Sequence, residues 1–325
     1  MRRRAGIEVN FYRKYRFRKQ GGSMMGENRL AAGAGALLAD NRNIMTACRR
    51  GPAIFRDEAG FGKLGRLERL TIRERRFRSK ACGAYGAFTV TRDITRYTSA
   101  KIFSKVGKRT DLFARFSVAE GERDIRGFAL KFRAEEGNWD LMVNGARVLF
   151  QRETLKFPDL KLATKREPRA GPGGGGMPYS FRHMHGFCNH VFSFINAKNK
   201  RYWAKFSLAT RQGVKNISEP DIVKDNNGAR RDLYESIERL DFPRWTLFMQ
   251  VIPEKAAAAM SRNPFNLAKA WFHKAHPLME VGVIELNRNP KGYFSEVERV
   301  EFNPGNVVPG ISLYAEKPFQ VCLFP

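Results

Sequence analysis

The sequence has few cysteines and no long apolar stretch, and each of these absences excludes a class of protein. Its 325 residues include four cysteines, which are widely separated and form no CxxC pair. A disulfide framework or a zinc site with the usual cysteine spacing is therefore not expected, and a reducing compartment fits best. The longest alanine run, residues 256–259, is flanked by Lys255 and Arg262. No stretch approaches the length of a membrane span, so we expect no membrane partner.

Acidic residues are scarce relative to basic ones. The chain has 59 Lys and Arg against 32 Asp and Glu, which gives a net charge of +27. A charge of this size attracts nucleic acid, an acidic membrane surface or an anionic cofactor. However, no RNP, KH or helix-turn-helix pattern accompanies basic segments such as FYRKYRFRK at residues 11–19. We therefore interpret these segments as solvated charge and expect no nucleic-acid partner.

Three parts are expected along the chain. Residues 1–27 form a basic extension that lacks the apolar region of a secretory signal. A transit peptide, a nucleic-acid arm and a true start at Met24 or Met25 all remain open for it. Residues 28–60 are rich in helix breakers and indicate an extended arm, and residues 61–325 indicate the folded core.

From residue 84 onward, apolar and β-branched residues alternate with polar ones or form short runs, as is typical of strands. The expected strands are residues 84–92, 112–118, 125–132, 139–143, 190–197, 200–208, 245–252 and 281–288. Consecutive segments of this kind predict a meandering antiparallel sheet that can close into a barrel. Residues 229–240 and 293–300 are expected to be helical, and GPGGGG at 171–176 a flexible connector. The fold class is therefore α+β with a barrel core.

Several residues are candidates for chemistry on their own. His183, His185 and His190 lie close together in RHMHGFCNH, but their spacing fits no standard zinc pattern, so we expect ordinary hydrogen-bonded histidines. Asn144 ends a predicted strand and, taken alone, is a turn residue. Arg75 and Arg115 are able to clamp a carboxylate with two donors each.

Seven segments, taken together, resemble the monofunctional haem catalase family, and most closely its bacterial small-subunit type. They occur in family order and are GAYGAFTVTRDITRYTSAKIFS, ERDIRGFALKF, EEGNWDL, RHMHGFCNHVFSFINAK, RDLYESIERLDFPRWTL, ELNRNPKGYFSEVE and FNPGNVVPGI. The resemblance implies an antiparallel eight-stranded β-barrel with an N-terminal arm and peripheral helices, and dismutation of hydrogen peroxide. It also implies haem b as cofactor and a homotetramer that exchanges the arm at residues 28–60. The implied location is the cytoplasm for a bacterial protein and the peroxisome for a eukaryotic one.

The resemblance also assigns roles to individual residues. Arg78 stands at the position of the distal histidine, Ser117 matches the distal serine, and Asn144 matches the asparagine that orients peroxide. The remaining assignments are haem-pocket positions: Arg75 and Arg115 for the propionates, Phe150 and Phe157 as lining, and His190 on the proximal face. The glycines of GAYG let the backbone approach closely beside this basic rim.

Three departures from the family pattern predict an impaired or inactive chain. Arg78 is permanently protonated and cannot accept a proton from peroxide. Cys322 replaces an arginine, and the sequence ends at Pro325, just before the position of the ligand tyrosine, so we expect weak haem binding or none. Neither His185 nor Ala209 supports an NADPH site, although residues 271, 273 and 274 match nucleotide positions, so no NADPH is expected.

Three interpretations stay open at this point. In the first, the sequence is a damaged record of a working haem catalase. In the second, the chain is a non-catalytic relic or pseudogene product of the family. In the third, it is a basic barrel that binds an anionic ligand or nucleic acid.

Overall fold

The computed structural model describes residues 80–118, 126–147, 178–217 and 227–313. Within these ranges the elements follow in the order β1 (Lys80–Val90), η1 (Lys101–Phe103), β2 (Arg109–Val118), β3 (Gly127–Ala134), β4 (Gly137–Asn144), η3 (Phe181–His183), β5 (Gly186–Phe187), β6 (Phe192–Ile195), β7 (Arg201–Thr210), α4 (Gly228–Glu238), β8 (Arg244–Pro253), α5 (Glu254–Ala259), β9 (Met279–Arg288), η4 (Tyr293–Glu298) and β10 (Ile311–Leu313). Strands dominate, and the helical elements are short.

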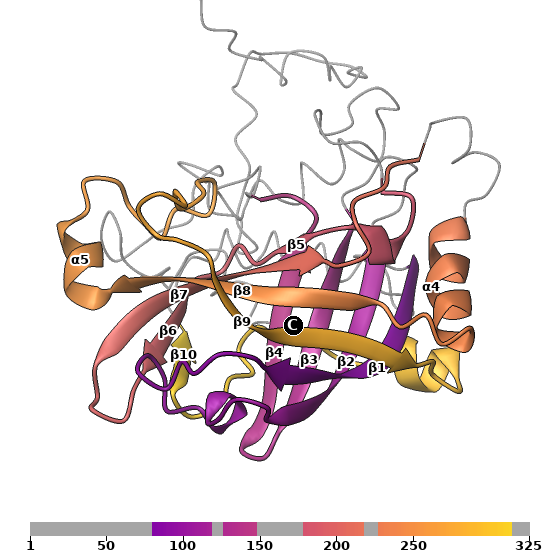
Figure 1. Ribbon diagram of the computed structural model, residues 1–325, viewed down its shortest axis with the longest axis horizontal. Helices are drawn as coiled ribbons and strands as arrows, with labels where there is room; N and C mark the ends of the chain where they lie inside the picture. Colours follow the sequence, from indigo (N-terminus) through magenta and orange to yellow (C-terminus); the bar gives the residue numbers. More distant parts are fainter. Residues whose placement is uncertain (1–79, 119–125, 148–177, 218–226, 314–325) are drawn as a thin grey trace, which may run out of the picture.

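All strands belong to one antiparallel sheet that closes on itself (Figure 1). The closed ring runs β7-β5-β4-β3-β2-β1-β9-β8 and returns to β7 through the β7–β8 pairing, which makes eight strands. Strands β6 and β10 extend the sheet outside this ring, with β6 paired to β7 and β10 to β6. The predicted eight-stranded antiparallel barrel is thus confirmed, as is the meander β1-β2-β3-β4.

Alternation along the strands separates the inner from the outer face of the barrel. Phe116, Phe128 and Val143 pair across β2, β3 and β4, and all three are buried in the main core. Aromatic rings fill much of this interior; Phe132 and Trp139, for example, stack with their centroids 4.9 Å apart. Because these side chains fill the interior, the polar residues that alternate with them point outward.

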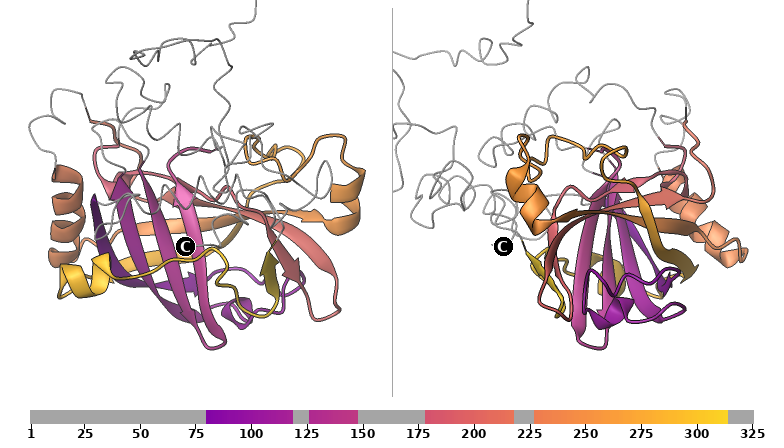
Figure 2. Two further views of the ribbon diagram at one scale, coloured as in Figure 1. Left: turned by 180° about the vertical axis from the view of Figure 1, so that it is seen from behind. Right: turned by 60° about the vertical axis from the view of Figure 1, so that its left-hand side comes forward.

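The helical elements lie outside the barrel wall. Figure 2 shows α4 and α5 at opposite ends of the barrel, with α4 beside β1 and β9 and α5 beside β7 and β8. The helix predicted at 229–240 is confirmed as α4, and the one at 293–300 is a π-helix, η4. The extension, the arm and the glycine connector lie outside the described residues.

Gly86 forms the tight point of the seam between β1 and β9. The register of this pairing shifts between Tyr85 and Gly86. A Cβ atom at Gly86 would overlap the carbonyl group of Glu285 and lie 2.8 Å from the Cα of Leu286. The GAYG segment therefore lies within strand β1, and Gly86 permits a close backbone approach between β1 and β9.

Substitution of Gly86 by alanine should weaken this seam. We expect Gly86→Ala to lower the free energy of unfolding by about 3 kcal/mol, because backbone atoms rather than a flexible side chain must move. Gly107→Ala is the control: Gly107 has φ +81° but nothing within 4 Å of its Cβ position, so the cost is only the left-handed conformation, about 1 kcal/mol. Urea unfolding measures both, and equal losses would contradict a steric role for Gly86.

Candidate functional site

The polar candidates Ser117 and Asn144 lie on one row across the sheet. Ser117 pairs with Gly127 of β3, Gly127 pairs with Asn144 of β4, and Asn144 pairs with Phe187 of β5. Directly paired residues project to the same face, and two strand spacings separate Ser117 from Asn144, or about 10 Å between backbones. Gly127 carries no side chain between them. Ser117 is only 2% exposed, so the row combines a buried hydroxyl with an amide on the outer face.

Arg115 lies two residues before Ser117 and projects to the same outer face. Its Nε donates a hydrogen bond to the carbonyl of Val297 at 3.0 Å, and its Nη2 lies 3.5 Å from Oε2 of Glu298. The residue is 4% exposed. A buried guanidinium needs such partners, because an unpaired charge in this position would be strongly unfavourable. The sequence identified Arg115 but missed both partners, which lie more than 180 residues away along the chain.

Cys82 lies near three arginines but is not a reactive thiol. Burial raises the pKa of Cys82 to about 12, against the lowering influence of the charges on Arg230, Arg115 and Arg126. The thiol therefore stays protonated at neutral pH, and the thiolate needed for nucleophilic chemistry is absent.

The histidines of RHMHGFCNH use ring nitrogens for backbone contacts. His183 Nδ1 donates to the carbonyl of Gly213 at 3.0 Å, and the backbone N–H of Thr210 donates to His185 Nδ1 at 3.2 Å. Burial, and then the charge on Arg147, lower the pKa of His185, which favours the neutral ring. Ordinary hydrogen-bonded histidines are thus confirmed at 183 and 185. Among the described residues, no three His, Cys, Asp or Glu side chains are arranged to hold a metal ion.

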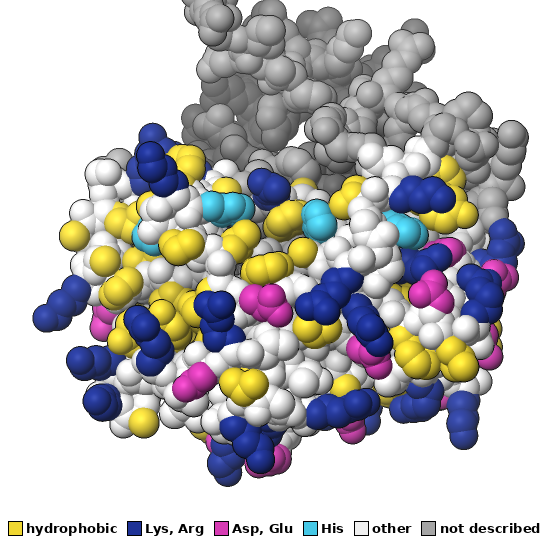
Figure 3. Space-filling view, viewed as in Figure 1, with side chains coloured by type: hydrophobic (Ala, Val, Ile, Leu, Met, Phe, Trp, Pro, Cys, Tyr) yellow, Lys and Arg dark blue, Asp and Glu magenta, His cyan; other side chains and the backbone are white. Residues whose placement is uncertain are grey.

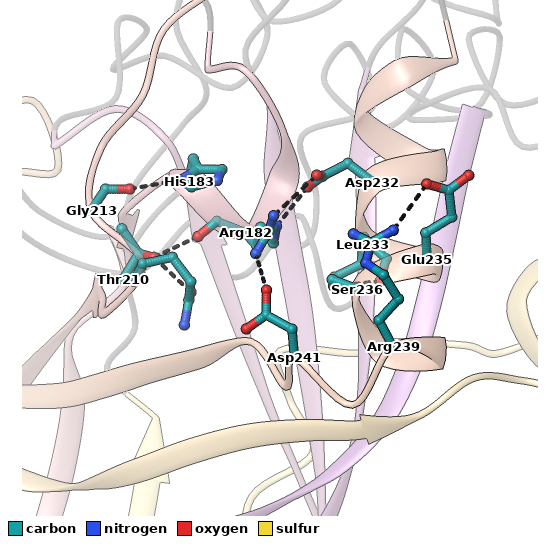
Figure 4. A network of polar contacts seen from close by, with 11 residues as sticks. Arg182, His183, Thr210, Gly213, Asp232, Leu233, Glu235, Ser236, Arg239 and Asp241 are labelled. Carbon is teal, nitrogen blue, oxygen red and sulfur yellow. Dashed lines mark hydrogen bonds and ion pairs between the residues drawn. The ribbon is translucent and has the colours of Figure 1, made fainter.

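Arg182 fastens this histidine segment to α4 (Figure 4). Its Nε lies 2.7 Å from Oδ2 of Asp232 on α4, and its Nη1 lies 2.8 Å from Oδ2 of Asp241 just after the helix. Burial alone would raise the pKa of Asp232, but the hydrogen bond from Arg182 holds it below its usual range. The clamp therefore sets the position of η3 and the loop that leads to β5.

The structure brings together three of the eight residues assigned to the site. Arg115, Ser117 and Asn144 share the outer face of β2 to β4, and His190 lies in the connection between β5 and β6. Arg75, Arg78, Phe150 and Phe157, as well as Cys322, lie outside the described residues.

The charge on the visible face is dispersed rather than gathered. Figure 3 shows lysine and arginine side chains spread over the whole face, with acidic side chains between them. A nucleic-acid groove needs a continuous basic stripe, which this face does not present. Within the described ranges, no helix has the length and apolar character required to cross a membrane.

Known proteins are similar to this chain in sequence and fold. A model of the catalase family matches residues 31–173 and 171–325. The catalase of Aliivibrio fischeri is 48% identical over 331 residues, which cover 91% of this chain and 69% of that protein. Catalase A of Pseudomonas putida is 44% identical over 330 residues, with the same coverage of 91% and 69%. A solved bacterial catalase superposes with a TM-score of 0.73 at 34% identity, covering 94% of this chain and 66% of that one.

Replacement of Asp232 tests the clamp on the histidine segment. Because the folded pKa of Asp232 lies below its unfolded value, its stabilisation is complete above the unfolded pKa and is lost as the pH falls through the folded pKa. Asp232→Asn should lower the free energy of unfolding by about 1–2 kcal/mol at pH 7, and this difference should shrink toward pH 3.

Glu254→Gln is the control for that measurement. Glu254 also pairs with an arginine, Arg201, at 3.1 Å, but both side chains are about half exposed. Exposed pairs contribute little, so this variant should unfold within about 0.5 kcal/mol of the unmodified chain. Urea unfolding measures both variants. A stabilising role for the Arg182–Asp232 pair would be contradicted if Asp232→Asn lost no more unfolding free energy than Glu254→Gln, or if its loss did not change with pH.

Proposed function

The chain belongs to the catalase family, whose reaction is the dismutation of hydrogen peroxide to water and oxygen, and we propose that it serves this reaction in peroxide detoxification. The observation that carries the proposal at the level of residues is the outer row of β2 to β4. It combines the Ser117 hydroxyl and the Asn144 amide with the buried Arg115 guanidinium two residues along β2. These are the donors that a peroxide and an adjacent carboxylate require.

The same row fits the peroxide-facing side of a haem b. Bound haem would supply the redox chemistry, since its iron changes oxidation state. Arg75 and Arg115 would pair with the propionates, Phe150 and Phe157 would line the ring, and His190 would lie on its proximal side. Arg115 is already paired with Glu298, so a propionate would share its guanidinium rather than take all of its donors.

Asn144 and Ser117 would orient peroxide, whereas Arg78 would slow the proton-transfer step. Asn144 offers an amide that both donates and accepts, and Ser117 offers a hydroxyl. Arg78, two residues before β1, stands where a base is required and remains protonated at all physiological pH values. We therefore infer slow turnover, with substrate positioning retained.

The remaining proposals concern assembly and location. Residues 28–60 would act as the exchanged arm of a homotetramer, and the protein would work in the cytoplasm, or in the peroxisome of a eukaryote. We propose no NADPH site. The comparisons do not favour the alternatives of a non-catalytic relic or a basic barrel that binds an anionic ligand or nucleic acid as its main function.

Restoring a base at residue 78 should raise turnover. With the protein reconstituted with haem, we expect Arg78→His to increase the initial rate of oxygen evolution by about 100-fold, since a placed general base contributes at least this much. Adding Asn144→Ala to this variant should remove most of the gain, because peroxide is no longer oriented.

Asn138→Ala is the matched control for Asn144. Asn138 lies on the same strand and the same face, but at its opposite, exposed end. We expect it to leave oxygen evolution unchanged. If the unmodified chain already evolves oxygen as fast as Arg78→His, the assignment of residue 78 is wrong.

Haem titration tests the role of Arg115 separately from turnover. We expect Arg115→Gln to weaken haem binding about tenfold, because glutamine keeps a polar amide but is shorter and loses the charge that pairs with a propionate. Arg244→Gln is the control, since Arg244 pairs with Glu285 at 2.7 Å on an exposed part of β8. Absorbance in the Soret region measures both, and equal affinities would exclude Arg115 from the haem pocket.

A further inference from the structure

A polar hollow lies on the outer wall of the barrel, where β1, β2, β3 and β9 run side by side. Its volume is about 250 Å³, and its lining residues are Tyr85, Gly86, Arg109, Asp111, Leu112, Arg133, Asn287 and Arg288. This volume lies below the range of about 300–1,000 Å³ found for organic ligands. The hollow is therefore suited to a small ion rather than to a cofactor.

Three arginines dominate the charge of this hollow. Arg109, Arg133 and Arg288 come from three different strands, and Asp111 is the acidic residue among the lining residues. No salt bridge joins any of the three guanidinium groups to a carboxylate among the described residues. Elsewhere on the barrel, arginines such as Arg182 and Arg244 do form such pairs. The hollow thus holds an excess of positive charge.

Tyr85 fixes two of these arginines in place. The guanidinium carbon of Arg288 lies 4.0 Å from the centroid of the Tyr85 ring, and that of Arg133 lies 5.8 Å from it. The Tyr85 hydroxyl interacts with the carboxylate of Glu296, which accepts hydrogen bonds from the backbone N–H groups of Lys291 and Gly292. Glu296 lies close enough to weaken the field at Arg288, but its oxygens are already engaged. The ring is held by Glu296 and presents a fixed face to both arginines.

A neighbouring hollow extends the same charged surface. It has a volume of about 280 Å³ and shares Arg109, Asp111 and Arg133 with the first. Lys108 and Glu135 also line it, but they pair with each other at 2.9 Å, so neither adds free charge. An anion with two linked charged groups is able to contact the arginines from both hollows at once.

We propose that this surface binds a small phosphate-bearing polyanion, of which pyrophosphate is the simplest example. Planar guanidinium groups match phosphate oxygens with two donors each, and the Asn287 amide adds a further donor at the rim. With three arginines and one aspartate the lining keeps a net positive charge, so electrostatic attraction grows with the number of negative charges on the ligand and favours a polyanion over a singly charged anion. The site lies apart from Ser117 and Asn144 and goes beyond peroxide turnover.

Calorimetric titration of the full chain with pyrophosphate at low salt tests the site. We expect Arg133→Ser to weaken pyrophosphate binding about tenfold, and Arg109→Ser combined with Arg133→Ser to remove it. Both side chains are exposed and form no ion pair within 4.0 Å in the described part of the chain, so the variants should melt at the same temperature as the unmodified chain. Binding should disappear in 1 M salt, because the charges are accessible to screening ions.

Arg96→Ser is the matched control. Arg96 also lies over a tyrosine ring, 4.6 Å from the centroid of Tyr97, but outside both hollows, and its loss changes the net charge equally. This variant should bind pyrophosphate like the unmodified chain. Equal affinities for Arg133→Ser and Arg96→Ser would show general attraction to a basic protein and overturn the site, as would no binding by the unmodified chain.

Discussion

The pairing register of β2, β3 and β4 is the constraint on which both faces of this barrel depend. Phe116, Phe128 and Val143 form one row, and Ser117, Gly127 and Asn144 form the next. Because neighbouring rows point to opposite faces, burying the first row in the core necessarily presents the second on the outer wall. A slip of one residue would place Ser117 in an aromatic interior and expose phenylalanine. Core packing therefore fixes the register, and the register aligns the polar residues.

The second constraint is the attachment of η4 to the outside of this wall. Three consecutive residues of η4 make three different contacts: Glu296 interacts with Tyr85, Val297 is buried against Ala81 and Phe113, and Glu298 pairs with Arg115. The wider turn of a π-helix allows neighbouring residues to reach separate points on the sheet. One short element thus holds a residue of the candidate active site and the aromatic ring of the anion hollow. Removing a partner from the buried Arg115 would leave a charge uncompensated, at a cost of about 3–5 kcal/mol.

Sequence reasoning located the elements whose pattern is local. The long strands were predicted from the alternation of inward-facing apolar residues with other residues. In residues 112–118, for example, Leu112, Ala114 and Phe116 face inward. The two-residue strand β5 is too short to have a period, yet without it β4 would not connect to β7 and the ring would stay open. Helix α5 also lacked a signal beyond its alanines. Glu298 was missed because nothing in the segment 293–300 reveals that its partner lies on β2. The anion hollow joins residues of the consecutive strands β1, β2 and β3 to residues of β9, and the sequence does not reveal the β1–β9 pairing that brings these two groups together.

Peroxide chemistry has two requirements, orientation of the substrate and transfer of a proton, and different residues of this chain bear on each. Orientation needs neutral donors and acceptors on a rigid support, and the row with Ser117 and Asn144 supports that role through its backbone pairing. Proton transfer needs a group whose pKa lies near the working pH. Arginine fails this requirement wherever its side chain points, because no protein environment deprotonates it at physiological pH. Under the proposed assignment of residue 78 to the base position, a single substitution there would suppress turnover without disturbing the barrel, since the packing that sets the row does not involve a base.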